Sequence, residues 1–147
     1  MGYRSEVAYR IGFRNTQVLD EFIAKVMVLG GAECEALKAC EFEKGGDGIV
    51  FVNFYASDVK WYDGYTDVDG HTKLYNLAVE WYPDDCAYNF LRVGESDDDS
   101  QCESDGADDV LDYVWDDFRI VRYIETPFSA NYEPIGDKLG LIEDVKP

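Results

Sequence analysis

Carboxylates at the spacing of metal ligands occur in two stretches of the chain. Residues 97–102 begin Asp-x-Asp-x-Gln, but Cys102 stands where a calcium-binding loop needs glycine. Residues 65–76 contain the glycine, Gly70, but lack the first acid and end on Asn76 instead of glutamate. Neither stretch satisfies the calcium pattern, which leaves only looser divalent binding by the acidic cluster as an alternative, and that binding would be weak without a preformed cage. We expect no resident metal ion and no cofactor.

Another acidic pattern could serve the hydrolysis of nucleic acids. Asp47, Asp58 and Lys60 loosely match an arrangement in which carboxylates hold Mg²⁺ and a lysine helps to activate water. Residue types this common match by chance, and the acidity of the chain would repel the substrate. A metal-dependent nuclease or phosphodiesterase is therefore only the third hypothesis for function.

The single histidine, His71, could act as a general base beside Asp67 or Asp69. Its position predicts the first turn of a helix instead, and no serine or cysteine nucleophile stands near it in sequence. The four cysteines have no C-x-x-C spacing, so we expect reduced thiols, with Cys34 and Cys40 in or near the core. We predict no catalytic residue and expect a protein that is not an enzyme.

Net charge is the strongest chemical feature of the chain. The 147 residues include 31 acids and 13 bases, which gives a formal charge of −18. Residues 84–117 hold thirteen of the acids and one base, Arg92, and therefore carry −12 of that charge. So dense a set of carboxylates cannot be buried, and it disfavours direct binding to nucleic acid or to an anionic membrane.

A dense carboxylate surface can imitate the phosphates of nucleic acid, because B-DNA carries one charge about every 1.7 Å of its axis. A protein with a basic nucleic-acid groove would bind such a surface with fast association and steep salt dependence. Aromatic anchors within a charged rim add affinity. The predicted partner-binding residues are Asp97, Asp98, Asp99, Glu103, Asp105, Asp108, Asp109 and Asp112, with Tyr113 and Trp115 as anchors.

Apolar periodicity predicts the elements that position these residues. Alternation indicates a strand over residues 5–13, and helical spacing follows from Asn15 or Thr16 as far as Gly30. The remaining predicted elements are a helical turn over 33–38, strands over 40–44, 49–55, 86–93 and 118–124, a helix over 71–82, and polar loops over 57–69 and 94–109.

This order, β-α-β-β-α-β with an extra C-terminal strand, is typical of ferredoxin-like folds, whose helices cover one face of an antiparallel sheet. Apolar residues make up 46% of the chain, enough for a core. We predict a single α+β domain over residues 1–127, with the acidic segment 84–117 inside it. The extra strand would pair with the fourth strand, and residues 128–147 would form a partly docked or flexible tail.

Three stretches resemble small uncharacterised acidic bacteriophage proteins: residues 1–7 (MGYRSEV), 56–62 (ASDVKWY) and 90–95 (FLRVGE), the last just before the acidic stretch. The resemblance would span most of residues 1–125. It implies a phage gene expressed in the bacterial host cytoplasm, in line with an N-terminus that lacks the apolar run of a signal peptide. Small acidic phage proteins often inhibit host defence or nucleic-acid machinery, some of them through DNA mimicry.

The leading hypothesis is a non-enzymatic inhibitor of the anti-CRISPR or anti-restriction class. It would occupy the basic nucleic-acid-binding surface of a host protein, without binding nucleic acid or membrane itself. The alternative is a structural or interaction protein whose acidity only aids solubility. An exposed edge strand would also support a homodimer, although no residue pattern specifies one.

Overall fold

The computed structural model of the chain describes residues 3–62, 64–96, 98–116, 118–120, 124–128 and 133–135. The elements follow in the order β1 (Ser5–Phe13), α1 (Thr16–Leu29), α2 (Gly31–Lys38), β2 (Glu41–Lys44), β3 (Val50–Val59), α3 (Thr66–Trp81), β4 (Cys86–Val93), β5 (Ser100–Gly106), α4 (Asp108–Trp115), β6 (Arg119–Ile120), β7 (Ile124–Glu125) and β8 (Glu133–Pro134).

One antiparallel sheet organises these elements, with its strands in the order β5-β4-β1-β3-β2-β8. Strand β1 is central and pairs along most of its length with β3 on one side and β4 on the other. Strand β5 lies at one edge, and no described strand pairs with its outer side. The predicted α+β class is confirmed, whereas its assignment to the ferredoxin-like type stays a prediction.

The first third of the chain follows the sequence prediction closely. Strand β1 covers the predicted residues 5–13. Helix α1 begins after Asn15, whose side chain accepts a hydrogen bond from the amide of Val18 at 2.9 Å and satisfies a donor that the first turn leaves open. The helix ends at Gly30, where φ is 64°, a conformation that glycine adopts at little cost.

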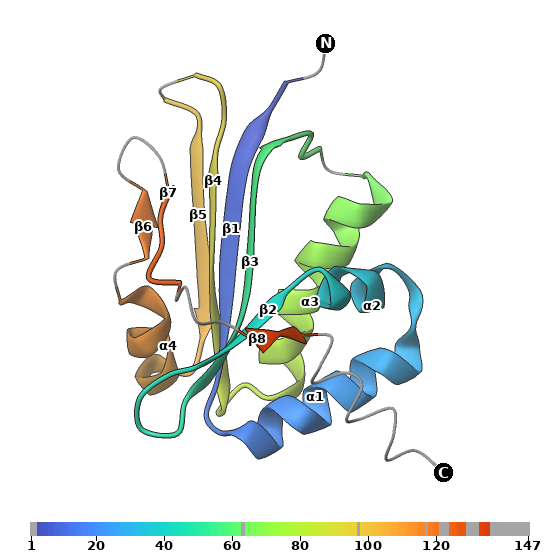
Figure 1. The fold of residues 1–147 in the computed structure, drawn as a ribbon, viewed down its shortest axis with the longest axis vertical. Helices are drawn as coiled ribbons and strands as arrows, with labels where there is room; N and C mark the ends of the chain where they lie inside the picture. Colours follow the sequence, from blue (N-terminus) through green and yellow to red (C-terminus); the bar gives the residue numbers. More distant parts are fainter. Residues whose placement is uncertain are drawn as a thin grey trace.

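The main hydrophobic core lies between one face of the sheet and helices α1, α2 and α3 (Figure 1). The odd-numbered residues of β1 from Val7 to Phe13 point into it and are fully buried. Helices α2 and α3 pack closely at Gly70, where an added Cβ would lie 2.5 Å from the carbonyl oxygen of Ala32. This core therefore fixes the sheet and three helices as one body.

Helix α4 lies on the opposite face of the sheet, on the same side as the β6–β7 hairpin (Figure 1). Its side chains Val110 and Val114 pack against Phe51 and Ala87. Gly12 of β1 allows this approach, because an added Cβ would lie 2.6 Å from Val114 Cγ2. The expectation that helices cover only one face is therefore wrong.

Other predictions for the second half of the chain are also wrong. The loop predicted over residues 94–109 contains β5 and the beginning of α4. The strand predicted over 118–124 is replaced by β6 and β7, which pair with each other, and the partner of β4 is β5. Helix α3 begins at Thr66 instead of His71, with two aspartates in its first turn, where the helix dipole favours acids.

Part of the predicted tail is docked on the sheet. Strand β8 pairs with β2, and Ile135 is buried in the main core. The predicted domain boundary at residue 127 stays a prediction, and residues 136–147 lie outside the described residues.

Candidate functional site

The acidic segment 84–117 spans β4, β5 and α4. Strand β5 carries much of its exposed surface, since Ser100 to Asp105 are all exposed and only Gly106 is partly covered. Antiparallel pairing with β4 fixes the direction of each side chain of β5. The predicted binding residue Asp97 lies outside the described residues.

Glu103 and Asp105 project from the same side of β5, about 6.6 Å apart along the strand. Pairing places Glu103 opposite Phe90 and Asp105 opposite Tyr88. The Tyr88 hydroxyl donates a hydrogen bond to Glu103 Oε1 at 3.1 Å. Burial, and after it the charge of Glu103, raises the pKa of Tyr88, so the hydroxyl keeps its proton and the carboxylate is held in place without being neutralised.

Helix α4 has a buried apolar side and an exposed acidic side. Asp108 and Asp112 are exposed and lie one turn apart, about 6 Å along the axis. Trp115 follows Asp112 by three residues, which places it on the same side of the helix, and 48% of its surface is exposed. The other predicted anchor, Tyr113, is half-buried and donates its hydroxyl to Asp47 in the β2–β3 turn.

Two of the predicted binding residues are already paired with arginines. Asp99 accepts a hydrogen bond from Arg92 at 2.7 Å and another from the Tyr3 hydroxyl. Asp109 accepts two from Arg14, at 2.7 and 3.1 Å. The hydrogen bonds from these arginines lower the pKa of both carboxyls. Asp99 and Asp109 thus tie the acidic segment to the fold.

The five other predicted acids that the structure describes make no ion pair with a described base. We call these five residues, together with Trp115, the acidic edge, because they lie along edge strand β5, at the turn before it, and on the exposed side of α4. Its acids are Asp98, Glu103, Asp105, Asp108 and Asp112.

His71 and the buried thiols belong to the core. The Tyr9 hydroxyl lies 2.6 Å from His71 Nδ1 and 3.4 Å from Cys40 Sγ. Burial lowers the pKa of His71 to about 4 and raises that of Cys40 to about 12. The thiol is therefore protonated and the imidazole neutral at pH 7, which suits packing and does not suit nucleophilic catalysis. The described cysteines are all free, as expected.

The residues of the nuclease hypothesis do not come together. Asp47 precedes β3 and Asp58 lies at its far end, so roughly 30 Å of extended strand separate the two carboxylates. Lys60 follows Asp58 and is equally remote from Asp47. In the described parts of the chain, no group of three or more histidine, cysteine, aspartate or glutamate side chains is placed to hold a metal ion.

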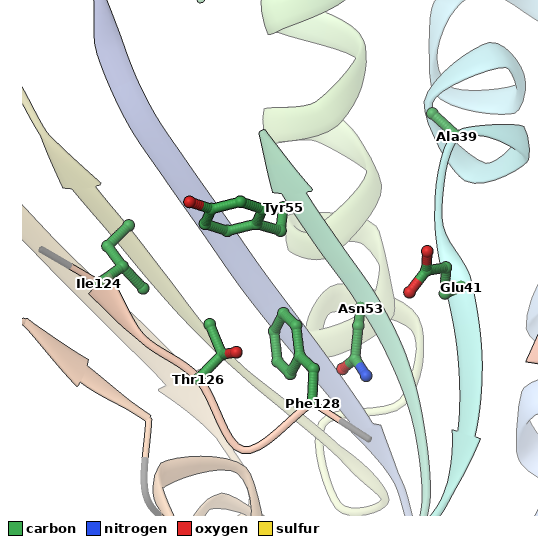
Figure 2. A pocket seen from close by; sticks show the side chains of 7 residues that line it. All are labelled: Ala39, Glu41, Asn53, Tyr55, Ile124, Thr126 and Phe128. Atoms are coloured by element: carbon green, nitrogen blue, oxygen red, sulfur yellow. The ribbon is translucent and has the colours of Figure 1, made fainter. Parts of the chain in front are cut away.

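A cavity of about 420 Å³ lies on the α4 side of the sheet, over β2 and β3. Sequence reasoning missed it, because its lining comes from strands and from a segment more than 60 residues away in the chain. Its described lining is Ala39, Glu41, Asn53, Tyr55, Ile124, Thr126 and Phe128 (Figure 2).

No protein family, no curated protein and no solved structure matches this chain. Among the described residues, no helix has the length and apolar character needed to cross a membrane.

Proposed function

We propose that this protein is a non-enzymatic inhibitor that uses the acidic edge to bind the basic nucleic-acid-binding surface of another protein. The observation that carries the proposal is the set of five carboxylates that have no basic partner among the described residues, on β5, in the turn before it and on α4, together with the exposed Trp115. The resemblance to small acidic phage proteins suggests a host defence or nucleic-acid-processing protein in the bacterial cytoplasm as the partner, with the acidic edge acting as a DNA mimic.

Spacing and exposure support this proposal. Neighbouring carboxylates on β5 and on α4 lie about 6 to 7 Å apart on regular elements, so their charges are held in fixed positions. Fixed charges need little reorganisation on binding, and their summed field speeds the approach of a basic partner. Trp115 can add apolar contact area beside them.

The acids of α4 lower the stability of that helix, and this is a second line of support for the proposal. Asp112 lies one turn from Asp108, and like charges at this spacing destabilise a helix. Asp116 caps the C-terminus of α4, where the helix dipole disfavours acids, and the last turn contains no base. A surface needed only for solubility could place acids where they do not weaken a helix. Local rules of this kind are most often broken at functional surfaces.

The alternative is a structural or interaction protein whose acidity serves only solubility and which binds its partner elsewhere.

We also propose that residues 5–93 form a ferredoxin-like unit to which β5 and α4 are added. Support for this unit is that β4, β1, β3 and β2 are neighbours in that order and pair antiparallel.

A charge-matched pair of variants separates these functions. The test variant carries Glu103→Gln, Asp105→Asn, Asp108→Asn and Asp112→Asn. The control removes the same charge from exposed acids elsewhere, by Glu21→Gln, Glu35→Gln, Asp58→Asn and Glu80→Gln. Each protein is used to capture partners from bacterial lysate at low and high salt, and the captured proteins are identified by mass spectrometry.

We expect the wild type and the control to capture the same nucleic-acid-binding protein at low salt, and duplex DNA or RNA to displace it. The test variant should lose this partner while keeping its circular dichroism spectrum. Equal capture by the test variant, or capture that nucleic acid does not displace, would contradict the proposed use of the acidic edge.

A further inference from the structure

The cavity over β2 and β3 is chemically unlike the acidic edge and lies toward the opposite end of the sheet (Figures 1 and 2). Glu41 and Asn53 are paired across β2 and β3, and Tyr55 follows two residues after Asn53 on the same face of the sheet. Thr126 and Phe128 line its other side. Figure 2 shows these side chains arranged around one open space.

The only described base beside this cavity is already paired. Arg10 is almost fully buried and donates to Asn53 Oδ1 at 2.9 Å and to Glu43 Oε1 at 2.7 Å. Asn53 donates in turn to Glu43 Oε1 at 2.9 Å. The Arg10–Glu43 pair is therefore neutral as a unit, and both of its members are hydrogen-bonded to Asn53 of the cavity lining.

Two carboxylates near the cavity have no cationic partner among the described residues. Glu41, which lines it, makes no ion pair and no hydrogen bond with another described residue. Glu6 accepts hydrogen bonds from the Tyr55 hydroxyl and from the amide of Ile124 at 2.9 Å, but no base of the described residues. The described side chains of this region thus carry an excess of negative charge, and an anionic ligand would face both carboxylates.

The cavity also presents two aromatic rings. Tyr55 is 47% exposed, and the ring of Phe128 already carries one guanidinium, since Arg10 Cζ lies 5.1 Å from its centroid. Guanidinium groups stack on aromatic faces and donate two parallel hydrogen bonds to a carboxylate, which a compact, strongly hydrated ammonium does less well.

We propose that this cavity binds a guanidinium group, with Glu41 as its charged partner and the ring of Tyr55 as its stacking surface. A cavity of about 420 Å³ has room for the whole side chain that carries the group. The source is either a free small molecule or an arginine side chain of another protein. The proposal does not depend on the acidic edge, because no acidic-edge residue lines the cavity.

Titrations followed by ¹⁵N NMR test this site on the full chain. The probe is N-acetylarginine amide, whose only charge is the guanidinium, and its neutral comparison is N-acetylcitrulline amide. A capped peptide, Gly-Gly-Arg-Gly-Gly, represents an arginine within a protein. The variants are Glu41→Gln, with Glu80→Gln as the control at a distant exposed acid, and Tyr55→Leu, with Tyr55→Phe as the control that keeps the ring.

We expect the arginine probe to shift the amide resonances of Asn53, Tyr55 and Thr126, and the citrulline probe to leave them in place. Glu41→Gln should weaken binding about tenfold and Tyr55→Leu about threefold, while both controls bind like the wild type. Tighter binding of the peptide than of the amide indicates a protein source, and equal binding indicates a small molecule; both support the site.

Each of the following results would overturn the proposal. They are no shift in the cavity resonances up to the solubility limit of the probe, equal shifts with citrulline, or unchanged affinity in Glu41→Gln. Shifts confined to β5 and α4 would likewise place guanidinium binding on the acidic edge and not in the cavity.

Discussion

The buried His71 should make the stability of the protein depend on pH in a predictable direction. Its Nδ1 shares a hydrogen bond with the Tyr9 hydroxyl at 2.6 Å, and burial raises the pKa of Tyr9 so that the hydroxyl keeps its proton. The rings of Phe54 and Trp61 cover the imidazole. The charge of Asp67 acts in the opposite direction, but burial dominates and lowers the pKa of His71 from 6.5 to about 4.

The direction of this pH dependence follows from whether the folded or the unfolded chain binds the proton at higher pH. As the pH falls below about 6.5, the histidine of the unfolded chain becomes protonated while that of the folded chain stays neutral until about pH 4. Stability from this residue is therefore complete above about pH 7 and is lost as the pH falls. At about pH 5 the loss amounts to about 2 kcal/mol relative to pH 8.

Urea unfolding of the wild type and of His71→Asn at about pH 8 and about pH 5 measures this effect. The asparagine amide can donate or accept a hydrogen bond with Tyr9 but does not titrate. We expect the wild type to lose about 2 kcal/mol more than the variant between the two pH values. Because His71 is the only histidine, its pKa can also be measured directly by NMR. Equal pH dependence of the two proteins, or a measured pKa near 6.5, would refute the reasoning.

Three substitutions test the packing and charge of the fold by chemical denaturation. Gly70→Ala should cost about 2 kcal/mol because its Cβ meets the backbone of α2, whereas Gly46→Ala, with open space around it, should be nearly neutral; equal effects would contradict the close α2–α3 contact. Glu43→Gln should cost about 3 kcal/mol because it leaves the buried Arg10 without its charged partner; no loss would mean that Arg10 finds another. Asp112→Asn should raise stability by about 0.5 kcal/mol by removing a repulsion within α4, and a loss of stability would show that the carboxylate serves the fold.

The elements that the sequence predicts well have strong apolar periods. Strand β1 alternates and α1 has apolar residues at helical spacing with a clear cap at each end, so both match their predicted extents. Strand β5 was missed because an edge strand exposed on both faces needs no apolar residues, and SQCESDG has no pattern that indicates a strand. In α4 the apolar side is only three residues wide and lies within acids that suggested a loop.

The candidate site was predicted only in part, for a physical reason. Composition shows where the acids are concentrated, but it does not show which of them an arginine neutralises. Arg14 is 95 residues away from Asp109 in the chain and reaches it only because the loop after β1 lies beside α4. The cavity over β2 and β3 likewise depends on the return of residues 124–128 to the sheet, which no local pattern predicts.

The central claim is that the acidic edge binds a partner in the manner of nucleic acid. The most direct test is the affinity of the captured partner for the wild type, the acidic-edge variant and the charge-matched control, each measured over a range of salt concentrations. The account predicts a steep loss of affinity with salt for the wild type and the control, and weak binding with a much shallower slope for the acidic-edge variant. The same affinity and the same slope for all three proteins would contradict it.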